Sequence, residues 1–166
     1  MRFDFDEPVW PVDLDQVRLW PMEGEDGPRL QVLFDGLSDF GPPSASPARQ
    51  TQSVRSSVCP KASNTSRSCS SGWRNGQMVG ALDCIVGYPA GHAWTVGMLV
   101  VAERHRGIGI GSSVVDWLEK TAANRGATTL RAVLRRENEL GLAFATRRGY
   151  AVEDSATHQD IVIGSL

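Results

Sequence analysis

Apolar and polar positions form a clear pattern on either side of a long segment that lacks one. Residues 17–22 alternate as in a short strand. An amphipathic helix follows, because Asp26 can serve as its N-cap, Pro28 fits its first turn, and apolar side chains recur at helical spacing at Leu30, Leu33, Phe34 and Leu37. The first forty residues therefore predict one strand and one helix.

The second half of the chain predicts alternating strands and helices. Residues 77–86 and 93–101 read as two strands of a hairpin around the turn at 88–91. A helix then runs to Asn124, with Gly126 as its stop and an inward face formed by Val114, Val115, Leu118 and Ala122. The remaining expected elements are a strand at 128–134, a helix at 139–148 capped by Asn138 and ended by Gly149, and strands around 150–152 and 160–163. This order predicts a mixed α/β sheet with flanking helices.

The segment 41–72 differs from its flanks in composition. It contains no acidic residue, four basic residues and ten serines, and Val54 and Val58 are its only large aliphatic or aromatic side chains. Such a segment cannot bury enough apolar area to offset the entropy of ordering the chain, so we expect a poorly ordered insert. A natural disordered loop and a locally shifted reading frame both explain it, and the nucleotide sequence across these codons would separate them.

Length and composition indicate a single domain spanning residues 1–166, with 41% hydrophobic and 22% charged residues. The formal charge of −2 gives no basic field for nucleic acid or an anionic membrane. No apolar run approaches the roughly 18 residues of a membrane span, and the acidic start lacks the basic region of a signal peptide. We therefore expect a cytoplasmic protein with neither nucleic-acid nor membrane partners.

The three cysteines, Cys59, Cys69 and Cys84, are odd in number and lack the spacing of a zinc site. Free thiols and no metal are expected. Cys84 lies in a predicted strand without a motif that would lower its pKa, which favours a buried, inert thiol over a covalent nucleophile.

The run from Arg104 to Ser112, RHRGIGIGS, lies between a hydrophobic strand and an amphipathic helix. Glycines let successive backbone N–H groups point into one concavity, and the helix N-terminus adds partial positive charge. Arg104 or Arg106 can add a charge-assisted contact. The run therefore predicts a phosphate or pyrophosphate site, against the alternative of a tight connection that binds nothing.

Two nucleotide-binding motifs fit this run poorly. A Walker loop needs lysine after its last glycine, where this chain has Ser112, and a dinucleotide GxGxxG counted from Gly107 would need glycine at the same position. The spacing Arg106-x-x-Gly109-x-Gly111 instead resembles the acyl-CoA pyrophosphate loop of the GNAT superfamily of N-acetyltransferases. A second stretch, with Asn138, Phe144, Gly149 and Tyr150, is similar to that family's Asn-x-x-Ala-x-x-Phe-Tyr-x-x-x-Gly-Phe signature.

The resemblance spans about residues 73–152 and implies a GNAT-like, mostly antiparallel α/β sheet in which the strand before the loop splays from its neighbour. In this family the splayed strand binds the pantetheine arm of acetyl-CoA, the loop amides hold the pyrophosphate, and the second motif lines the acyl arm. The cofactor-binding residues so implied are Met98, Leu99, Val100, Val101, Arg106, Gly107, Ile108, Gly109, Ile110, Gly111, Ser112, Asn138 and Phe144. Asn138 could equally be a plain helix cap, and Phe144 is expected to belong mainly to the core.

Catalytic groups are less clearly indicated. Ala145 stands where the family has the tyrosine that protonates the leaving thiolate, and Tyr150 falls at an apolar position of the motif and is expected to fill core. Asp83 interrupts an apolar strand and is the candidate general base, against the alternative that strand alternation turns it toward solvent. Tyr88 and His92 flank the hairpin turn and are weaker candidates, and Glu103 is expected to face water.

The sequence thus predicts transfer of an acetyl group from acetyl-CoA to a primary amine by direct attack. The acceptor would be a small molecule or a peptide, and the resemblance implies a homodimer as one expected assembly. The acidic residues 1–40, with ten acids and three bases, could attract a cationic amine or simply be a solvated surface. Two alternatives stay open: an acyl-CoA-binding protein without turnover, which Ala145 and the 41–72 segment favour, and a nucleotide-binding module unrelated to CoA.

Overall fold

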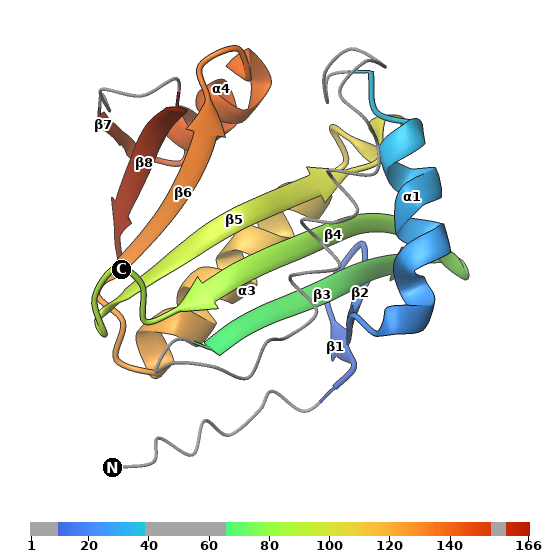
Figure 1. The fold of residues 1–166 in the computed structure, drawn as a ribbon, viewed down its shortest axis with the longest axis horizontal. Coiled ribbons are helices and arrows are strands. Elements are labelled where there is room, and N and C mark those ends of the chain that lie inside the picture. The colour runs from blue at the N-terminus through green and yellow to red at the C-terminus, as the bar shows by residue number, and fades with distance from the viewer. Residues whose placement is uncertain (1–9, 39–65, 154–158) are drawn as a thin grey trace.

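The computed structural model describes residues 10–38, 66–153 and 159–166 (Figure 1). Its helical elements are η1 (Gly24–Asp26), α1 (Gly27–Asp35), η2 (Glu103–His105), α3 (Ile110–Asn124) and α4 (Glu139–Arg147), of which η1 and η2 are 3-10 turns. Its strands are β1 (Val12–Asp13), β2 (Arg18–Pro21), β3 (Ser66–Arg74), β4 (Gln77–Val86), β5 (Ala93–Val101), β6 (Thr129–Arg135), β7 (Ala151–Glu153) and β8 (Gln159–Ser165).

Within the described residues the strands form one sheet in the order β1-β2-β3-β4-β5-β6-β8-β7. Every neighbouring pair is antiparallel except β5 and β6, which are parallel. A parallel pair needs a crossover connection, and α3 provides it. The predicted mixed, mostly antiparallel α/β sheet is therefore confirmed.

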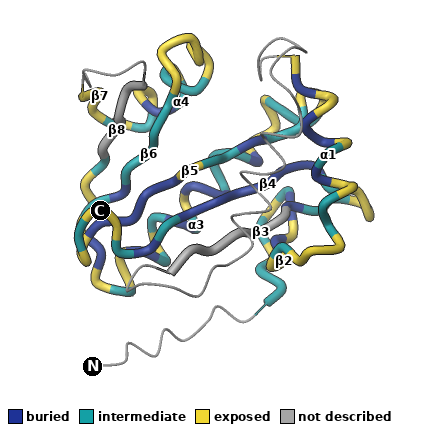
Figure 2. The backbone as a smooth tube through the Cα atoms, in the orientation of Figure 1, coloured by how far each residue is buried: buried dark blue, intermediate teal, exposed yellow. Residues whose placement is uncertain are grey.

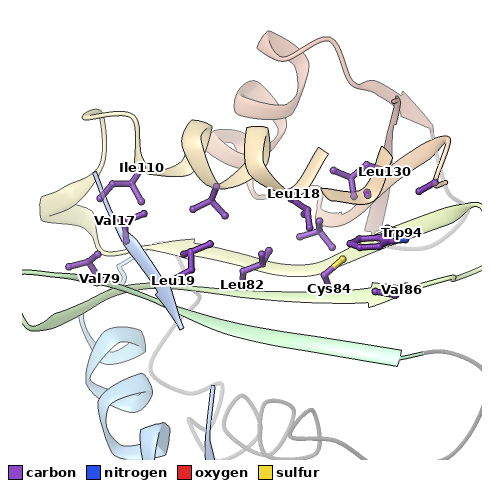
Figure 3. Close-up of a cluster of buried hydrophobic side chains, with 14 residues drawn as sticks. Val17, Leu19, Val79, Leu82, Cys84, Val86, Trp94, Ile110, Leu118 and Leu130 are labelled. Carbon is purple, nitrogen blue, oxygen red and sulfur yellow. The ribbon is translucent and has the colours of Figure 1, made fainter. Parts of the chain in front are cut away.

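Helices α1 and α3 pack on opposite faces of this sheet (Figure 3). On the α3 face, Leu82, Cys84 and Trp94 pack with side chains from the helix and from Leu130. On the α1 face, the buried side of the helix packs against Ala81 and Val100. The residues predicted to face inward in both helices are buried, and β4 is buried along most of its length because it lies between the two layers (Figure 2).

Strands β5 and β6 separate part-way along their length. Their pairing covers Ala93–Val96 and Thr129–Ala132 only, and beyond it the two strands diverge (Figure 1). The divergence begins at an irregularity in β5: Asp83 pairs with Met98 and Cys84 pairs with Val96, which leaves Gly97 as an extra residue. A β-bulge of this kind bends the strand that carries it. We call the opening beyond this bulge the split, and it confirms the splayed strand pair that the sequence predicts.

Gly80 fixes the position of the diverging half of β5. A Cβ added at Gly80 would lie 2.8 Å from the carbonyl oxygen of Val100, which is closer than real contacts allow. Glycine at this position therefore allows β4 to pair closely with this part of β5, along the edge of β5 that faces away from the split.

The expectation of an unordered segment at 41–72 is wrong at its C-terminal end. Residues 66–72 belong to β3, which pairs with β2 on one side and β4 on the other. Its backbone pairs with β4 along its length and with β2 at residues 70–73, so this strand forms without a continuous apolar side-chain pattern. Residues 41–65 lie outside the described part of the chain. Among the described helices, none has the length and apolar character required to cross a membrane.

Candidate functional site

The glycine-rich run forms an exposed turn between β5 and α3. Gly107 and Gly109 have φ angles of 76° and 95°, a left-handed backbone conformation that residues other than glycine rarely adopt. A Cβ at either position would meet no atom within 4 Å, so backbone conformation, not lack of space, favours glycine here. The turn ends at Ile110, whose buried side chain anchors the start of α3 in the core.

The first turn of α3 presents backbone amides to this exposed turn. The amide of Ser113 donates to the carbonyl of Gly109 over 2.9 Å. The preceding amides, those of Ile110, Gly111 and Ser112, have no acceptor within a helix that begins at this point. With the positive end of a 15-residue helix behind them, these amides form an anion-binding arrangement. The structure thus brings together the loop residues that the sequence predicts for a pyrophosphate.

Arginine side chains make the surroundings of the loop positive. Burial, followed by the charges of Arg104 and Arg74, lowers the pKa of His105 in η2. Arg104 donates to the side-chain oxygen of Gln77 over 3.0 Å. Arg106 donates from Nε to the carbonyl of Val101 over 2.9 Å, so it also ties the loop to the end of β5. Arg106 therefore has a structural contact in addition to the anion-binding role predicted for it.

The last residues of β5 alternate between the two cores. Val100 is buried on the α1 face, whereas Leu99 and Val101 pack on the α3 face. Because their side chains point to the two faces, their backbone forms the strand edge toward β6, and the pairing of β5 with β6 stops at Val96. This edge is the part of β5 that can bind an extended ligand in the split.

One residue of the second motif lies against the start of α3, and another caps α4. The ring of Phe144 packs against Gly111, where an added Cβ would be 3.7 Å from the ring carbon Cζ. Phe144 is only partly buried, so the expectation that it belongs mainly to the core is wrong, because α4 places it over the start of α3. Asn138 caps α4, and its Oδ1 accepts from the amide of Gly141 over 2.9 Å, as expected for the helix-cap alternative.

An ion-pair network that sequence reasoning missed holds α4 against α3. Arg148 donates to Asp116 over 2.6 Å and to Glu119 over 3.1 Å, and the hydroxyl of Tyr150 donates to Glu119 over 2.7 Å. The guanidinium of Arg148 also lies 5.9 Å from the ring centre of Phe144. The spacing of Asp116 and Glu119 by three residues, which puts them on one helix face, was the available signal. The network thus holds Phe144 in place over Gly111.

The network shifts the pKa of two of its members. Burial and the hydrogen bond to Glu119 raise the pKa of Tyr150 above its ordinary value. Burial opposes the charged form of Arg148, but the carboxylates of Asp116 and Glu119 outweigh it and raise the pKa of that guanidinium. Tyr150 packs against the α3-side core, as predicted, and its hydroxyl is engaged by Glu119.

Replacing Tyr150 by phenylalanine is expected to lower the free energy of unfolding at pH 7 by about 1.5 kcal/mol, since a hydrogen bond to a charged group is lost. A tyrosine whose pKa is raised on folding stabilises the protein fully below its unfolded pKa of about 10 and loses that contribution at higher pH. The difference between wild type and variant should therefore shrink above about pH 10.

Chemical denaturation at several pH values measures this effect. Tyr88→Phe is the matched control, because the Tyr88 side chain is exposed and its loss should change stability little at any pH. Equal stability of Tyr150→Phe and wild type at pH 7 would show that the hydroxyl contributes nothing.

Asp83 is buried, with 3% of its surface exposed, so the alternative that it faces solvent is wrong. Its neighbours Leu82 and Cys84 pack in the α3-side core (Figure 3). Side chains alternate along a strand, so Asp83 lies on the α1 face. It pairs with Met98 directly beside the bulge at Gly97. A buried carboxylate therefore lies where the split begins.

The hairpin residues lie at the closed end of the strand pair. The carbonyl of His92 accepts from the amide of Thr128 over 2.9 Å, and the carbonyl of Tyr88 accepts from the hydroxyl of Thr95 over 2.7 Å. The glycine-rich turn follows the opposite end of β5, so the structure does not bring Tyr88 and His92 to it. Glu103 is exposed, as expected, and accepts from the backbone and hydroxyl of Ser38.

Cysteine and metal chemistry find little support in the described residues. Cys84 is a buried cysteine outside any disulfide, as predicted. Across residues 10–38, 66–153 and 159–166, no group of three or more His, Cys, Asp or Glu side chains is arranged to hold a metal ion.

Comparison with known families and structures gives one consistent result. The family model for the acetyltransferase (GNAT) family matches residues 32–150. An acetyltransferase from Thermus thermophilus is 24% identical and superposes with a TM-score of 0.72, over 93% of this chain and 100% of that one. The PaiA N-acetyltransferase from Thermoplasma acidophilum, solved in complex with coenzyme A, has a TM-score of 0.75 at 14% identity, over 91% and 99% of the two chains.

A third similar structure comes from Salmonella typhimurium. It is an acetyltransferase that modifies the N-terminal serine of ribosomal protein L7/L12, with a TM-score of 0.72 and 17% identity over 92% of this chain and 96% of that one. No curated protein matches the sequence. At these identities the solved structures establish the fold, and the family match establishes the relationship.

Proposed function

This chain belongs to the GNAT family of acetyltransferases, and we propose that it transfers an acetyl group from acetyl-CoA to a primary amine. The observation that carries the proposal is the split between β5 and β6, because it opens beside the glycine-rich turn. A split strand edge and an anion-binding helix start, placed next to each other, fit an extended ligand that ends in a pyrophosphate.

The residues present fit acetyl-CoA in chemistry as well as in shape. The amides of Gly107 to Ser112 would bind the pyrophosphate, and the backbone of Leu99 to Val101 would pair with the amide groups of the pantetheine arm. Phe144 would line the arm from α4, where its ring packs on Gly111. Bound acetyl-CoA would supply the activated acetyl group, and the protein would supply its orientation.

Asp83 is proposed as the general base. Amines such as the lysine side chain, with a pKa of about 10.4, are protonated at neutral pH and cannot attack until a proton is removed. Asp83 is buried on the α1 face beside the bulge, so its carboxylate could accept that proton from an amine that approaches from the α1 side. The acceptor and acetyl-CoA would then meet at the split from opposite faces of the sheet.

The leaving thiolate requires a proton from elsewhere. Ala145, at the position of the family's tyrosine, is buried and carries no proton donor. The hydroxyl of Tyr150 donates its hydrogen bond to Glu119 and is therefore engaged elsewhere. We therefore propose that solvent water protonates the thiolate. The buried Ala145 is also the observation that favours the second candidate, a GNAT protein that binds acyl-CoA without turnover.

Calorimetric titration with acetyl-CoA tests the proposal, followed by measurement of CoA thiol release in the presence of primary amines. We expect acetyl-CoA to bind in the micromolar range, about −8 kcal/mol, ATP not to displace it, and amines to accelerate thiol release. Binding without acceleration by any amine would favour the non-catalytic candidate. Absence of binding by a demonstrably folded protein would overturn both, and displacement by ATP would support a generic nucleotide site.

A further inference from the structure

Strand β6 presents two arginines on the α1 face of the sheet. Leu130 and Ala132 pack into the core under α3. Because side chains alternate along a strand, Arg131, Val133 and Arg135 lie on the opposite face. Among the described helices, α1 covers the far end of that face and does not extend over β6 (Figure 1). An acceptor that approaches from the α1 side therefore meets these arginines.

Arg131 lies in the same region of the sheet as Asp83. Ile85 of β4 pairs with Thr95 of β5, which pairs in turn with Arg131 of β6. Asp83 is two residues from Ile85, toward the glycine-rich turn, and shares its face. Neighbouring strands are about 4.8 Å apart and successive residues of a strand about 3.4 Å apart, so two strands across and two residues along place the Cα atoms of Asp83 and Arg131 about 12 Å apart. One small acceptor can span that distance.

The guanidinium of Arg131 lacks an acidic partner within the described part of the chain. Arg18, Arg29 and Arg148 form ion pairs there, whereas Arg131 forms no ion pair, hydrogen bond or ring contact through its side chain in that part of the chain. Arg131 is nevertheless partly buried. Arg148, which is also partly buried, is held by two carboxylates, as a desolvated charge requires. Arg131 has no such compensation within the described residues.

We propose that the acceptor is a primary amine that also carries an anionic group, a carboxylate or a phosphate, and that Arg131 binds this group while the amine lies at Asp83. This inference rests on the proposed acetyl transfer and names its substrate class. A planar guanidinium pairs with carboxylate and phosphate oxygens through two parallel hydrogen bonds. Arg135, on the same face and four residues further along, extends the positive surface toward the open end of the split.

A panel of amines of matched length tests the proposal. It contains 4-aminobutyrate and 6-aminohexanoate, 2-aminoethyl phosphate, neutral alkylamines, and the diamines putrescine and cadaverine. We expect kcat/KM for the best anionic amine to exceed that of the matched alkylamine and diamine by about tenfold or more, the effect of one charge-assisted contact. The carboxylate and phosphate members identify which anion is preferred.

Variants of Arg131 locate the effect. Arg131→Met keeps side-chain length and should raise KM for anionic amines about 10- to 100-fold, with kcat and the kinetics of alkylamines unchanged. Arg131→Glu should shift preference to the diamines. Lys120 is exposed on α3, so Lys120→Met removes a positive charge from the α3 side of the sheet as a control. It should change neither KM for anionic amines nor the preference between amines. Direct binding of the same amines to the CoA-saturated protein provides a readout that does not need turnover.

Three outcomes would overturn the proposal. Alkylamines or diamines could be the preferred acceptors, Arg131→Met could leave KM for anionic amines unchanged, or no anionic amine could bind to the CoA-saturated protein. In each of these, binding of acetyl-CoA and acetylation of another amine would leave the proposed acetyl transfer standing. Loss of acetyl-CoA binding itself would instead refute the proposed function.

Discussion

Gly109→Asp is expected to weaken acetyl-CoA binding about 100-fold or more without unfolding the protein. A Cβ at this position meets no atom within 4 Å, and aspartate tolerates the left-handed backbone that Gly109 adopts at the start of α3. Its carboxylate would stand where the pyrophosphate is expected. Two unit charges 5 Å apart repel by about 3 kcal/mol at an effective dielectric constant of 20, which corresponds to about 100-fold in affinity.

Gly109→Asn is the matched control for this prediction. Asparagine has nearly the same size as aspartate and the same tolerance for the left-handed region, but it carries no charge. Its affinity for acetyl-CoA should stay within a few-fold of wild type. Calorimetric titration of the three proteins measures the difference. If Asn weakens binding as much as Asp, backbone strain and not charge would account for the loss, and if neither weakens it, the pyrophosphate does not bind at this turn.

Much of the fold could be predicted because its signals are local. The hairpin strands at 77–86 and 93–101 have the predicted bounds, since two apolar runs and the turn at 88–91, which contains Pro89 and Gly91, specify both. The inward faces of α1 and α3 follow from helical spacing. By contrast, β3 at Ser66–Arg74 has a serine-rich sequence with no strand pattern. Its pairing with β4 is a local hairpin, and the Asn75-Gly76 turn, with φ angles of 50° and 74°, was the available signal. Its pairing with β2 joins segments far apart in the sequence and is invisible in a short window.

The candidate site shows the same division between local and non-local signals. The glycine-rich turn is a contiguous motif, so its position between β5 and α3 could be predicted from sequence, whereas the ligand assigned to it stays a prediction. Three other features depend on contacts between distant segments: Phe144 rests on Gly111, Arg148 joins α4 to α3, and Asp83 is buried at the bulge. Asp83 is the instructive case, because alternation alone allowed a solvent-facing position. Its burial is decided by what lies on the α1 face of the sheet.

Asp83→Asn is expected to lower kcat/KM for alkylamines by about 100-fold or more, within the range that general-base catalysis contributes. The amide is nearly isosteric with the carboxylate but cannot accept the ammonium proton. Affinity for acetyl-CoA should not change, because Asp83 lies on the α1 face, away from the glycine-rich turn. Titration with acetyl-CoA therefore separates loss of catalysis from loss of structure.

The choice of amine separates a base from a residue that only maintains the fold. An acceptor such as 2,2,2-trifluoroethylamine is already neutral at the assay pH, so its reaction should suffer much less from Asp83→Asn than that of an alkylamine. Asp35→Asn changes an exposed carboxylate on α1 and should affect neither acceptor. An equal loss for both amines in the Asp83 variant would mean that Asp83 positions β4 beside the bulge and that the proton is removed by another group.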